Sequence, residues 1–261
     1  MRSVSVGYAS RTTWYKRGSA WGQLVFASRG LLAVHTEAGV WIVPPHRAMW
    51  VPPDLAHDVE MLGRVAMHTL YLRASLVRGL PATCRMLEVS PLLRELLRRA
   101  LRRGTLDHAV PAERHLVAVL LDEVTPLPLG PVDLPTPRDP RAARAAALVR
   151  ASPDGRHTLA AAAREAGASA RTLERLFRAE TRLGFGAWRQ RARLLRALQL
   201  IAEGTSVTSA GLAVGYDSPS AFVAAFRRTL GTTPGRYFAA LEEDGTTIKS
   251  INDKSRHSFL E

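Results

Sequence analysis

The sequence predicts an α+β protein with more than one domain, in which a small β-barrel or sandwich precedes an all-helical domain. Short β-rich runs separated by turn residues fill positions 22–72. A proline-rich stretch follows at 125–137, and the chain after it has helical periodicity and an internal repeat. With 261 residues, the chain has room for about two domains.

The composition indicates a polyanionic partner. The chain has 36 Lys and Arg residues against 23 Asp and Glu, which gives a formal net charge of +13. Most of the excess lies at positions 137–240, where 17 basic residues face 7 acidic ones, a net charge of +10. Strong local positive charge favours binding to nucleic acid or to an anionic surface. We therefore expect the anion to bind in this region.

The sequence excludes several classes of protein. A single cysteine, Cys84, allows neither an intramolecular disulfide nor a cysteine-based zinc site. No apolar run approaches the roughly 18 residues of a membrane-spanning helix, and the N-terminus lacks an apolar signal region. No nucleotide-binding loop, His-Glu-x-x-His motif or nucleophile elbow is present. We expect a soluble cytoplasmic protein that is not an enzyme and has no membrane partner.

The N-terminal half is predicted to contain five strands, followed by two helices. The strands are expected at 23–27, 31–36, 40–43, 48–51 and 65–72, and Arg29-Gly30 and Pro44-Pro45 are among the turns between them. This spacing is typical of a small barrel or sandwich. Amphipathic helices are expected at 91–103 and 111–124, the first with the apolar stripe Leu92, Leu93, Leu96, Leu97 and Leu101. Such helices would cover the barrel or pair with a second subunit.

A linker is predicted at 126–138. Five prolines and one glycine between Pro126 and Pro137 oppose both a helix and a central strand. We expect a semi-rigid, extended tether between the two domains.

The helical region contains a repeat with an offset of 49 residues, in which Ser169–Arg178 recurs as Ser218–Arg227. A short alanine-rich helix that ends at Gly167 or Gly215 precedes each copy. A short helix, a glycine turn and a Ser-capped second helix form a helix-turn-helix unit, whose second helix enters the major groove of DNA. The repeat therefore predicts two DNA-binding units joined by a helix at 186–202.

One face of each second helix is predicted to be buried and the other to meet DNA. The expected core residues are Leu173, Leu176 and Phe177 in the first unit and Phe222, Ala225 and Phe226 in the second. The remaining faces carry Arg171, Thr172, Glu174, Arg175 and Arg178, or Pro219, Ser220, Val223, Ala224, Arg227 and Arg228. Arginines on such a face neutralise phosphates or bind guanine edges.

Residues 139–240 resemble the AraC/XylS family of bacterial transcription factors. The resemblance rests on Leu159-Ala160, Ala166-Gly167-Ala168-Ser169 and Leu173-x-Arg175-x-Phe177-Arg178, and on the segments Ala213-x-Gly215-Tyr216-Asp217-Ser218-Pro219-Ser220-Ala221-Phe222 and Gly231-Thr232-Thr233-Pro234-Gly235-Arg236-Tyr237. It implies that both units of one chain bind successive faces of the major groove of promoter DNA.

The resemblance also implies which residues contact DNA. Base contacts are assigned to Arg171, Glu174 and Arg175 in the first unit and to Ser220, Val223 and Ala224 in the second. Phosphate contacts are assigned to Ser169, Thr172, Arg178, Ser218, Arg227 and Arg228. Ala224 stands where many relatives have a long polar side chain, so we expect weak direct readout by the second unit. An arginine that binds guanine in the first unit contributes about 1–3 kcal/mol of discrimination.

Residues 22–30 and 41–59 resemble the cupin sensor of a subgroup of these regulators. This resemblance implies a cupin-like barrel that binds an unidentified small-molecule effector. The residues predicted to line the effector pocket are Trp21, Gln23, His35, Trp50 and His57. The aromatic residues fit the core of a barrel equally well. Some members of the subgroup control a neighbouring efflux transporter gene.

Metal binding is the alternative use of the N-terminal histidines. Cupins often hold a metal with histidines and a glutamate, and the candidate ligands here are His35, Glu37, His46, His57 and His68. The His-x-His that usually precedes the Gly-Gln-Leu segment is replaced by Arg17-Gly18-Ser19. We therefore predict neither a metal nor another cofactor.

These inferences divide the chain into five regions. They are a cupin-like sensor at 1–80, a helical dimerisation or connector region at 81–125, the linker at 126–138, the double helix-turn-helix domain at 139–241 and a disordered tail at 242–261. We predict an effector-controlled, homodimeric transcriptional regulator with RNA polymerase as a candidate partner. The two alternatives are a metal-dependent cupin enzyme that carries a DNA-binding domain and a ligand-independent architectural protein.

Overall fold

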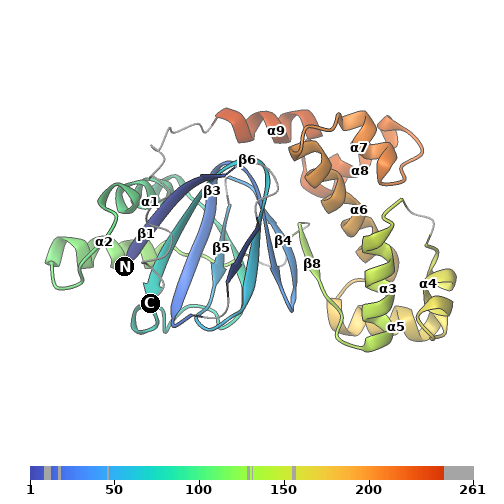
Figure 1. Cartoon of the computed structure of the whole chain (residues 1–261), viewed down its shortest axis with the longest axis horizontal. Coiled ribbons are helices and arrows are strands. Elements are labelled where there is room, and N and C mark those ends of the chain that lie inside the picture. The colour runs from blue at the N-terminus through green and yellow to red at the C-terminus, as the bar shows by residue number, and fades with distance from the viewer. Residues whose placement is uncertain are drawn as a thin grey trace.

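The structure is a computed structural model that describes residues 1–8, 13–16, 19–45, 47–127, 130, 132–154 and 157–243. An antiparallel sheet fills the N-terminal part, and helices form the C-terminal part (Figure 1). The predicted α+β class is confirmed. From residue 244 onward, the expected tail lies outside the described residues.

The sheet is organised around two long strands. Its members are β1 (Arg2–Tyr8), β2 (Thr13–Lys16), β3 (Trp21–Thr36), β4 (Gly39–Val43), β5 (Arg47–Val51), β6 (His57–Arg73), β7 (Arg85–Glu88) and β8 (Asp133–Pro135). Strands β3 and β6 pair with each other along most of their lengths. Strands β1 and β5, with β7 beyond β5, flank one half of this pair, whereas β2 and β4, with β8 beyond β4, flank the other.

Residues 29–30 form a bulge rather than the predicted turn. The pairing of β3 with β6 shifts its register between Ala27 and Arg29 and again between Arg29 and Leu31. Gly30 has a φ of 78°, a left-handed conformation that costs glycine little. The strand therefore bends here and continues, as expected of a β-bulge, and two predicted strands become one.

The strand pairs of the described residues form an open, branched arrangement. The order β1-β6-β3-β4-β8 has β2 attached to β6 and β5-β7 attached to β3, and none of these pairs closes a ring. The sequence predicted a barrel or sandwich here, and the structure shows an antiparallel sheet.

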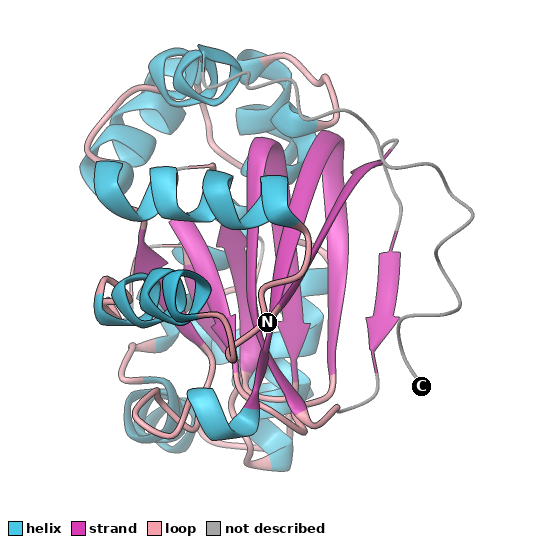
Figure 2. Cartoon of the chain, turned by 90° about the vertical axis from the view of Figure 1, so that its left-hand side faces the viewer, coloured by secondary structure: helices cyan, strands magenta, loops and turns pink. Residues whose placement is uncertain are grey.

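Two helices cover one face of the sheet, as Figure 2 shows from that side. They are α1 (Pro91–Arg103) and α2 (Pro111–Asp122), close to their predicted positions, and a short 3-10 helix at Ala74–Leu76 precedes them. Leu93 and Leu97 pack into a cluster with Leu24, Phe26 and other residues of the sheet. Leu92, expected in the same apolar stripe, is instead 52% exposed.

The linker is part of the sheet rather than a free tether. Strand β8 pairs with β4, and the N–H of Leu127 donates to the carbonyl of Met86. Proline is tolerated in β8 because this strand lies at an edge of the sheet. The linker therefore belongs structurally to the β-rich part of the chain.

The C-terminal region consists of helices with two helix-turn-helix units. The helices are α3 (Pro140–Ala151), α4 (Leu159–Glu165), α5 (Ala170–Thr181), α6 (Phe185–Ala202), α7 (Val207–Ala213), α8 (Pro219–Leu230) and α9 (Pro234–Glu243). Helices α4 and α5 form one unit and α7 and α8 the other, at opposite ends of α6 (Figure 1). No helix among the described residues is long and apolar enough to cross a membrane.

The predicted core of both units is confirmed. Each of the six core residues expected from the repeat is buried: Leu173, Leu176, Phe177, Phe222, Ala225 and Phe226. The ring of Phe177 lies 5.3 Å from that of Trp188, and the ring of Phe226 lies 5.6 Å from that of Tyr237. The repeat therefore extends to the aromatic contacts that fix each second helix on the next helix of the chain.

Candidate nucleic-acid interface

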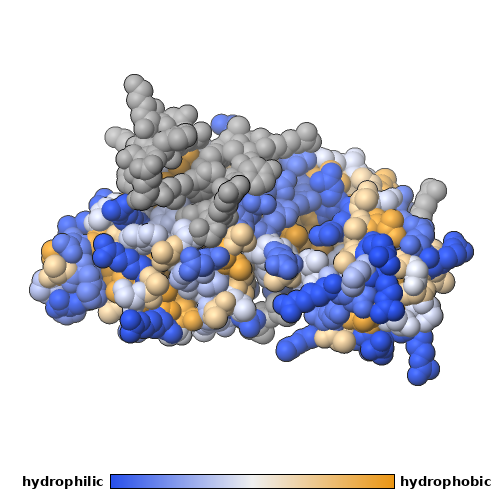
Figure 3. All heavy atoms as spheres, turned by 60° about the horizontal axis from the view of Figure 1, so that its bottom comes forward, coloured by the Kyte–Doolittle hydropathy of each residue, from blue (hydrophilic) through white to orange (hydrophobic). Residues whose placement is uncertain are grey.

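Helix α5 presents a basic face to solvent. The side chains of Arg171, Arg175 and Arg178 are exposed, and Thr172 is half-buried. Ser169 caps the helix, because its Oγ accepts from the N–H of Thr172 at 3.1 Å. Figure 3 shows long hydrophilic side chains projecting from the end of the molecule formed by the C-terminal helices, on the right of the view. This face can approach the phosphates of a DNA groove without unfolding any element.

Glu174 is engaged inside the first unit. One carboxylate oxygen accepts from Nε of Arg178 at 2.8 Å, and the other accepts from the N–H of Phe185 at 3.0 Å. The second bond satisfies a free amide at the start of α6. A Cβ on Gly184 would lie 2.6 Å from Oε1 of Glu174, so glycine makes room for the carboxylate. In this arrangement Glu174, which the family resemblance assigns to a base, holds the corner between α5 and α6.

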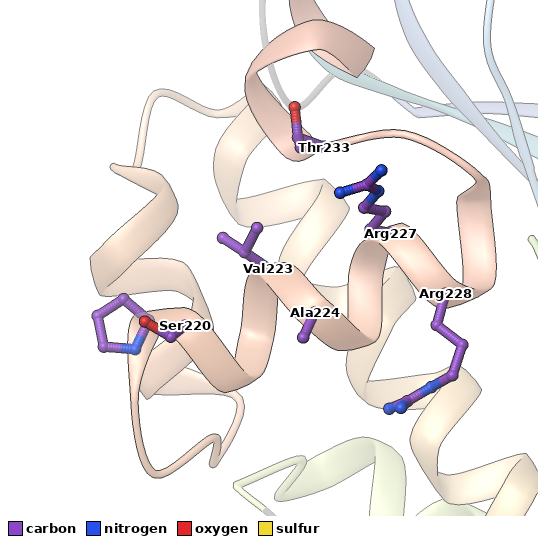
Figure 4. A pocket seen from close by; sticks show the side chains of 7 residues that line it. Ser220, Val223, Ala224, Arg227, Arg228 and Thr233 are labelled. Atoms are coloured by element: carbon purple, nitrogen blue, oxygen red, sulfur yellow. The ribbon is translucent and has the colours of Figure 1, made fainter.

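Helix α8 borders a surface hollow of about 780 Å³. The residues that line it are Pro219, Ser220, Val223, Ala224, Arg227, Arg228 and Thr233. Figure 4 shows Val223 and Arg227 pointing to the side of Thr233, with Ala224 and Arg228 on the neighbouring side of the helix. Ser218 caps the helix through the N–H of Ala221 at 3.2 Å. The structure thus brings the predicted contact residues of the second unit other than Ser218 together around one concavity.

Thr233 is a lining residue that we did not predict. It precedes α9, and its Oγ1 accepts from the N–H of Arg236 at 3.5 Å. The repeat offset of 49 residues places Thr233 opposite Gly184, which carried no predicted contact, so the repeat gave no signal for this residue.

Two arginines of the helical region bind backbone carbonyls inside their units. Arg144 donates to the carbonyl of Ala166 at 2.8 Å, and Arg193 donates to the carbonyl of Val214. Each bond satisfies a carbonyl at the end of the first helix of a unit, and the two arginines are 49 residues apart. Arg193 also lies over the ring of Tyr216, 4.3 Å from its centre. The net charge of the helical region therefore overstates the number of arginines available to DNA.

Helix α6 connects the helical region to the linker and the sheet. Arg191 donates to the carbonyls of Gly130 and Asp133, both at 2.8 Å, and Nε1 of Trp188 donates to the carbonyl of Pro135 at 2.7 Å. At the bend of β6, a Cβ on Gly63 would clash with the carbonyl oxygen of Ala202 at the end of α6. The two regions are therefore in direct contact.

Asp133 is a buried carboxylate at this junction. It is 2% exposed, and its Oδ2 accepts from the N–H of Gly130 at 2.6 Å. Oδ1 is buried without a hydrogen-bond partner in the described structure. Burial raises the pKa of this carboxyl, and the nearby charge of Arg191 opposes the shift.

The residues predicted to line an effector pocket are not all together. Trp50 is 1% exposed and packs in the cluster under α1 and α2, with Nε1 donating to the carbonyl of Pro81. Gln23 is buried on the opposite face of the sheet, since it alternates with Leu24 of that cluster. The guanidinium groups of Arg2 and Arg73 lie 5.7 and 5.6 Å from the ring centre of Trp21.

The histidines have protein partners. Nε2 of His35 lies 3.0 Å from Oε2 of Glu60, and this hydrogen bond lowers the pKa of the glutamate. His57 is buried, with Nδ1 at 2.9 Å from the carbonyl oxygen of Leu55.

His68 lies between the hydroxyls of Ser5 and Ser28, and burial lowers its pKa to about 4. His46, another candidate ligand, lies outside the described residues. Within the described ranges, no group of three His, Cys, Asp or Glu side chains is arranged to hold a metal ion.

Comparisons with known proteins agree with this architecture. A family model described as a helix-turn-helix domain matches residues 162–240, from α4 to α9. The HTH-type transcriptional regulator NimR of Escherichia coli is 36% identical over 220 residues, which cover 84% of this chain and 80% of NimR. The HTH-type transcriptional regulator RipA of Corynebacterium glutamicum is 38% identical over 107 residues, 40% of this chain and 32% of RipA.

A solved structure is also similar. It is a transcriptional regulator from Chromobacterium violaceum, described as AraC-type, with 29% identity over 41% of this chain and 96% of that one, at a TM-score of 0.38. The similarity to NimR covers 84% of this chain and therefore extends beyond the helix-turn-helix region. The matched relatives are regulators rather than enzymes. The chain therefore belongs to the AraC/XylS family of DNA-binding, helix-turn-helix transcriptional regulators.

Proposed function

We propose that this regulator binds a specific promoter sequence through both units of one chain and that a small molecule bound by its β-rich region controls this binding. One observation carries the first part: two capped helices with exposed faces, α5 and α8, lie at opposite ends of α6. An 18-residue helix spans about 27 Å at 1.5 Å per residue, so with its flanking turns it separates the units by roughly one turn of DNA.

In this proposal contacts to phosphates and contacts to bases have separate roles. Exposed Arg178, Arg227 and Arg228 neutralise phosphates, which gives affinity that falls as salt rises. Arg171 and Arg175 contact base edges and set the register on the DNA. Ser169, Thr172 and Ser218 stand at or near helix starts, where the amides and hydroxyls favour a phosphate.

The test is binding of the full chain to the promoter DNA upstream of its own gene and its divergent neighbour, with scrambled DNA as the control, across a salt series. We expect a preference of about a thousandfold or more for one site. Equal and steeply salt-dependent binding to both DNAs would contradict sequence-specific regulation and favour an architectural role.

The proposed effector site is the face of the sheet that carries Gln23. In this proposal the β-rich region forms a cupin-like barrel around that face. Gln23 and Thr69 are buried on it, and the hydroxyl of Thr69 has no hydrogen-bond partner in the described structure. An unsatisfied buried hydroxyl costs about 1–3 kcal/mol, so a polar ligand atom placed there would recover that energy. His35 and His57 cannot both lie on this face, because His35 pairs with Asp58 and neighbouring residues of a strand point to opposite faces. The burial of Trp50 under α1 and α2 favours a packing role for that residue.

The route from this site to DNA is the junction between the sheet and α6. Strand β8 pairs with β4 of the sheet, and its carbonyls accept hydrogen bonds from Arg191 and Trp188 of α6. A ligand that shifts β4 would therefore shift the helix that sets the spacing of the two units. Effector binding changes DNA affinity only if the ligand binds the two arrangements with different affinity.

We further propose a homodimer through α1 and α2. Leu92 of α1 and Val119 of α2 are large apolar side chains that are 52% and 44% exposed. Sedimentation of the wild-type chain and of Leu92→Glu tests this, and a dimer that the substitution dissociates is the expected result. Two further predictions stay untested. RNA polymerase is the predicted protein partner, and a neighbouring transporter gene is the predicted target.

A further inference from the structure

The two helix-turn-helix units differ at one structurally equivalent corner. In the first unit, Glu174 accepts hydrogen bonds from Arg178 and from the first turn of α6 beside Gly184. The repeat offset places Val223, Arg227 and Thr233 at the matching positions of the second unit. A carboxylate is thus replaced by an aliphatic side chain, and a glycine by a threonine that caps its own helix through the N–H of Arg236.

This replacement changes what the corner offers to a ligand. In the first unit the carboxylate accepts a hydrogen bond from Arg178 and occupies the space beside Gly184. In the second unit Val223 leaves the hollow beside α8 open and provides no negative charge for Arg227. Val223 and Ala224 contribute aliphatic side chains to the lining, and Arg227 and Arg228 follow them one turn further along the helix (Figure 4). The surface is therefore apolar in the middle and positive at its border.

We infer that the second unit recognises the C5-methyl groups of thymines, which Val223 and Ala224 contact while Arg227 and Arg228 bind the adjacent phosphates. The inference rests on the proposed function, because α8 must enter a major groove. In that groove thymine is the one standard base that presents a methyl group, and small apolar side chains contact it. A long polar side chain at position 224 would cover the hollow, whereas alanine leaves it accessible.

This assignment gives the two units different base preferences. Arg171 and Arg175 on α5 match the O6 and N7 acceptors of guanine. The aliphatic pair on α8 has no donor or acceptor, so it distinguishes bases by shape and by the methyl group alone. The recognised DNA therefore has a guanine-containing segment and, about one turn away, a thymine-containing segment.

The experiment begins with selection of bound sequences by the full chain from random duplexes. Guanines that lose their effect in Arg171→Ala mark the segment bound by α5. Each thymine of the neighbouring segment is then replaced by uracil, which keeps the base-pairing groups and removes only the methyl. We expect at least one replacement to weaken binding about fourfold, the effect of losing one buried methyl group.

The double variant Val223→Ser, Ala224→Ser should bind thymine and uracil duplexes almost equally. The matched control is Arg175→Ala, which should lower affinity and leave the ratio of thymine to uracil binding unchanged. Thermal unfolding of each variant checks that it folds.

Three outcomes would overturn the inference. If every uracil duplex binds like its thymine parent, α8 contributes no methyl recognition, although a selected sequence would still support the proposed function. If the uracil effect persists in the double variant, the methyl acts through DNA shape and not through Val223 and Ala224. If selection yields no preferred sequence, the proposed function fails together with this inference.

Discussion

At the scale of single residues, the arginines of this chain fall into distinct classes. Arg171 and Arg228 are exposed on the two recognition helices, whereas Arg144 and Arg193 satisfy helix carbonyls inside their units. A guanidinium group suits both tasks, since it has five N–H donors and keeps its charge when partly buried. The sequence alone does not distinguish the classes, because both occur on helices with the same periodicity.

Replacing the two exposed arginines should separate specificity from affinity. Arg171→Ala is expected to lose about 1–3 kcal/mol of discrimination at one base position. Arg228→Ala should weaken binding to all sequences alike and reduce the slope of log affinity against log salt by about 0.9. Binding of both variants to a selected site and its single-base variants, over a salt series, measures the two effects. Identical behaviour would contradict the division of roles.

Glu174 should act mainly through the fold. Glu174→Ala leaves the N–H of Phe185 without its acceptor, and we expect it to lower the free energy of unfolding by about 0.5–2 kcal/mol, as for other helix caps. Glu174→Gln keeps an acceptor oxygen and should restore most of the loss. Urea unfolding measures both. A change of base preference at one position with unchanged stability would instead support the base contact that the family resemblance implies.

Asp133 should make stability depend on pH in an unusual direction. Burial raises the pKa of its carboxyl, so the folded state holds the proton more tightly than the unfolded state does. Its contribution is therefore most favourable at low pH and is lost as pH rises from the unfolded value of 3.8 through the folded value. We expect Asp133→Asn to stabilise the protein at pH 7.5 and to do so much less at pH 4, measured by urea unfolding.

Asp139 provides a control of opposite sign. It is half-buried at the start of α3, and the hydrogen bond from Arg141 lowers the pKa of its carboxyl to about 2. Its contribution is present at neutral pH and is lost as pH falls towards 2. If Asp133→Asn shows the same pH trend as the loss of Asp139, the burial of Asp133 does not control its titration.

At the scale of elements, the sequence predicted the helical region better than the sheet. Serine caps, glycine turns and apolar spacing are local signals, and they placed the starts of α5, α6 and α8 within one residue of those observed. In β3 and β6 the bends at Gly30 and Gly63 resemble turns in sequence, and whether a strand continues depends on pairing with distant residues. Strand β8 was not predicted for the same reason, because its partner β4 lies about ninety residues away in the chain.

The candidate site was predictable only in part. The repeat identified the exposed faces of α5 and α8, because core and surface alternate regularly on a helix. It did not reveal that Glu174 is occupied by the start of α6, since that contact depends on how α6 leaves the corner at Gly184. The pocket prediction grouped Gln23 with Trp50, although the two side chains lie on opposite faces of the sheet. They come from different strands, and only the register between those strands shows which face each side chain occupies.

The attachment of the linker to α6 should be measurable. Arg191→Met removes two hydrogen bonds from a charged donor to the carbonyls of Gly130 and Asp133, and we expect a loss of roughly 2–4 kcal/mol in the free energy of unfolding. Faster hydrogen exchange in the amides of β4 and β8 should accompany it. Arg196→Met, on an exposed part of the same helix, is the control. Equal effects of the two would contradict a specific junction.

At the scale of the whole molecule, the sheet and the DNA-binding helices share one continuous hydrophobic core. Val34 and Ile42 of the sheet belong to the same cluster as Leu195 and Phe226 of the helices. The close approach of Gly63 to Ala202 lies at the same junction. The relative position of the two regions is therefore set by packing as well as by the linker.

A methyl group at Gly63 should push the two regions apart. Gly63→Ala places a Cβ against the carbonyl of Ala202, and we expect a larger radius of gyration by small-angle scattering and altered DNA affinity. Gly104→Ala is the matched control for backbone strain, since Gly104 has a similar φ of 74° and nothing within 4 Å of an added Cβ. An effect shared by both variants would show that strain, and not contact with α6, is responsible.

The strand contributed by the linker also determines where this protein can be cut. A fragment that ends before residue 133 would lack β8 and leave the edge of β4 unpaired. An uncovered strand edge is a template for pairing with other chains, so such a fragment should aggregate. A sensor fragment that retains residues up to Pro135 keeps that edge covered, and a DNA-binding fragment can begin at Asp139, the cap of α3. The boundary for making the two halves separately, or for exchanging them between regulators, therefore lies at residues 136–138.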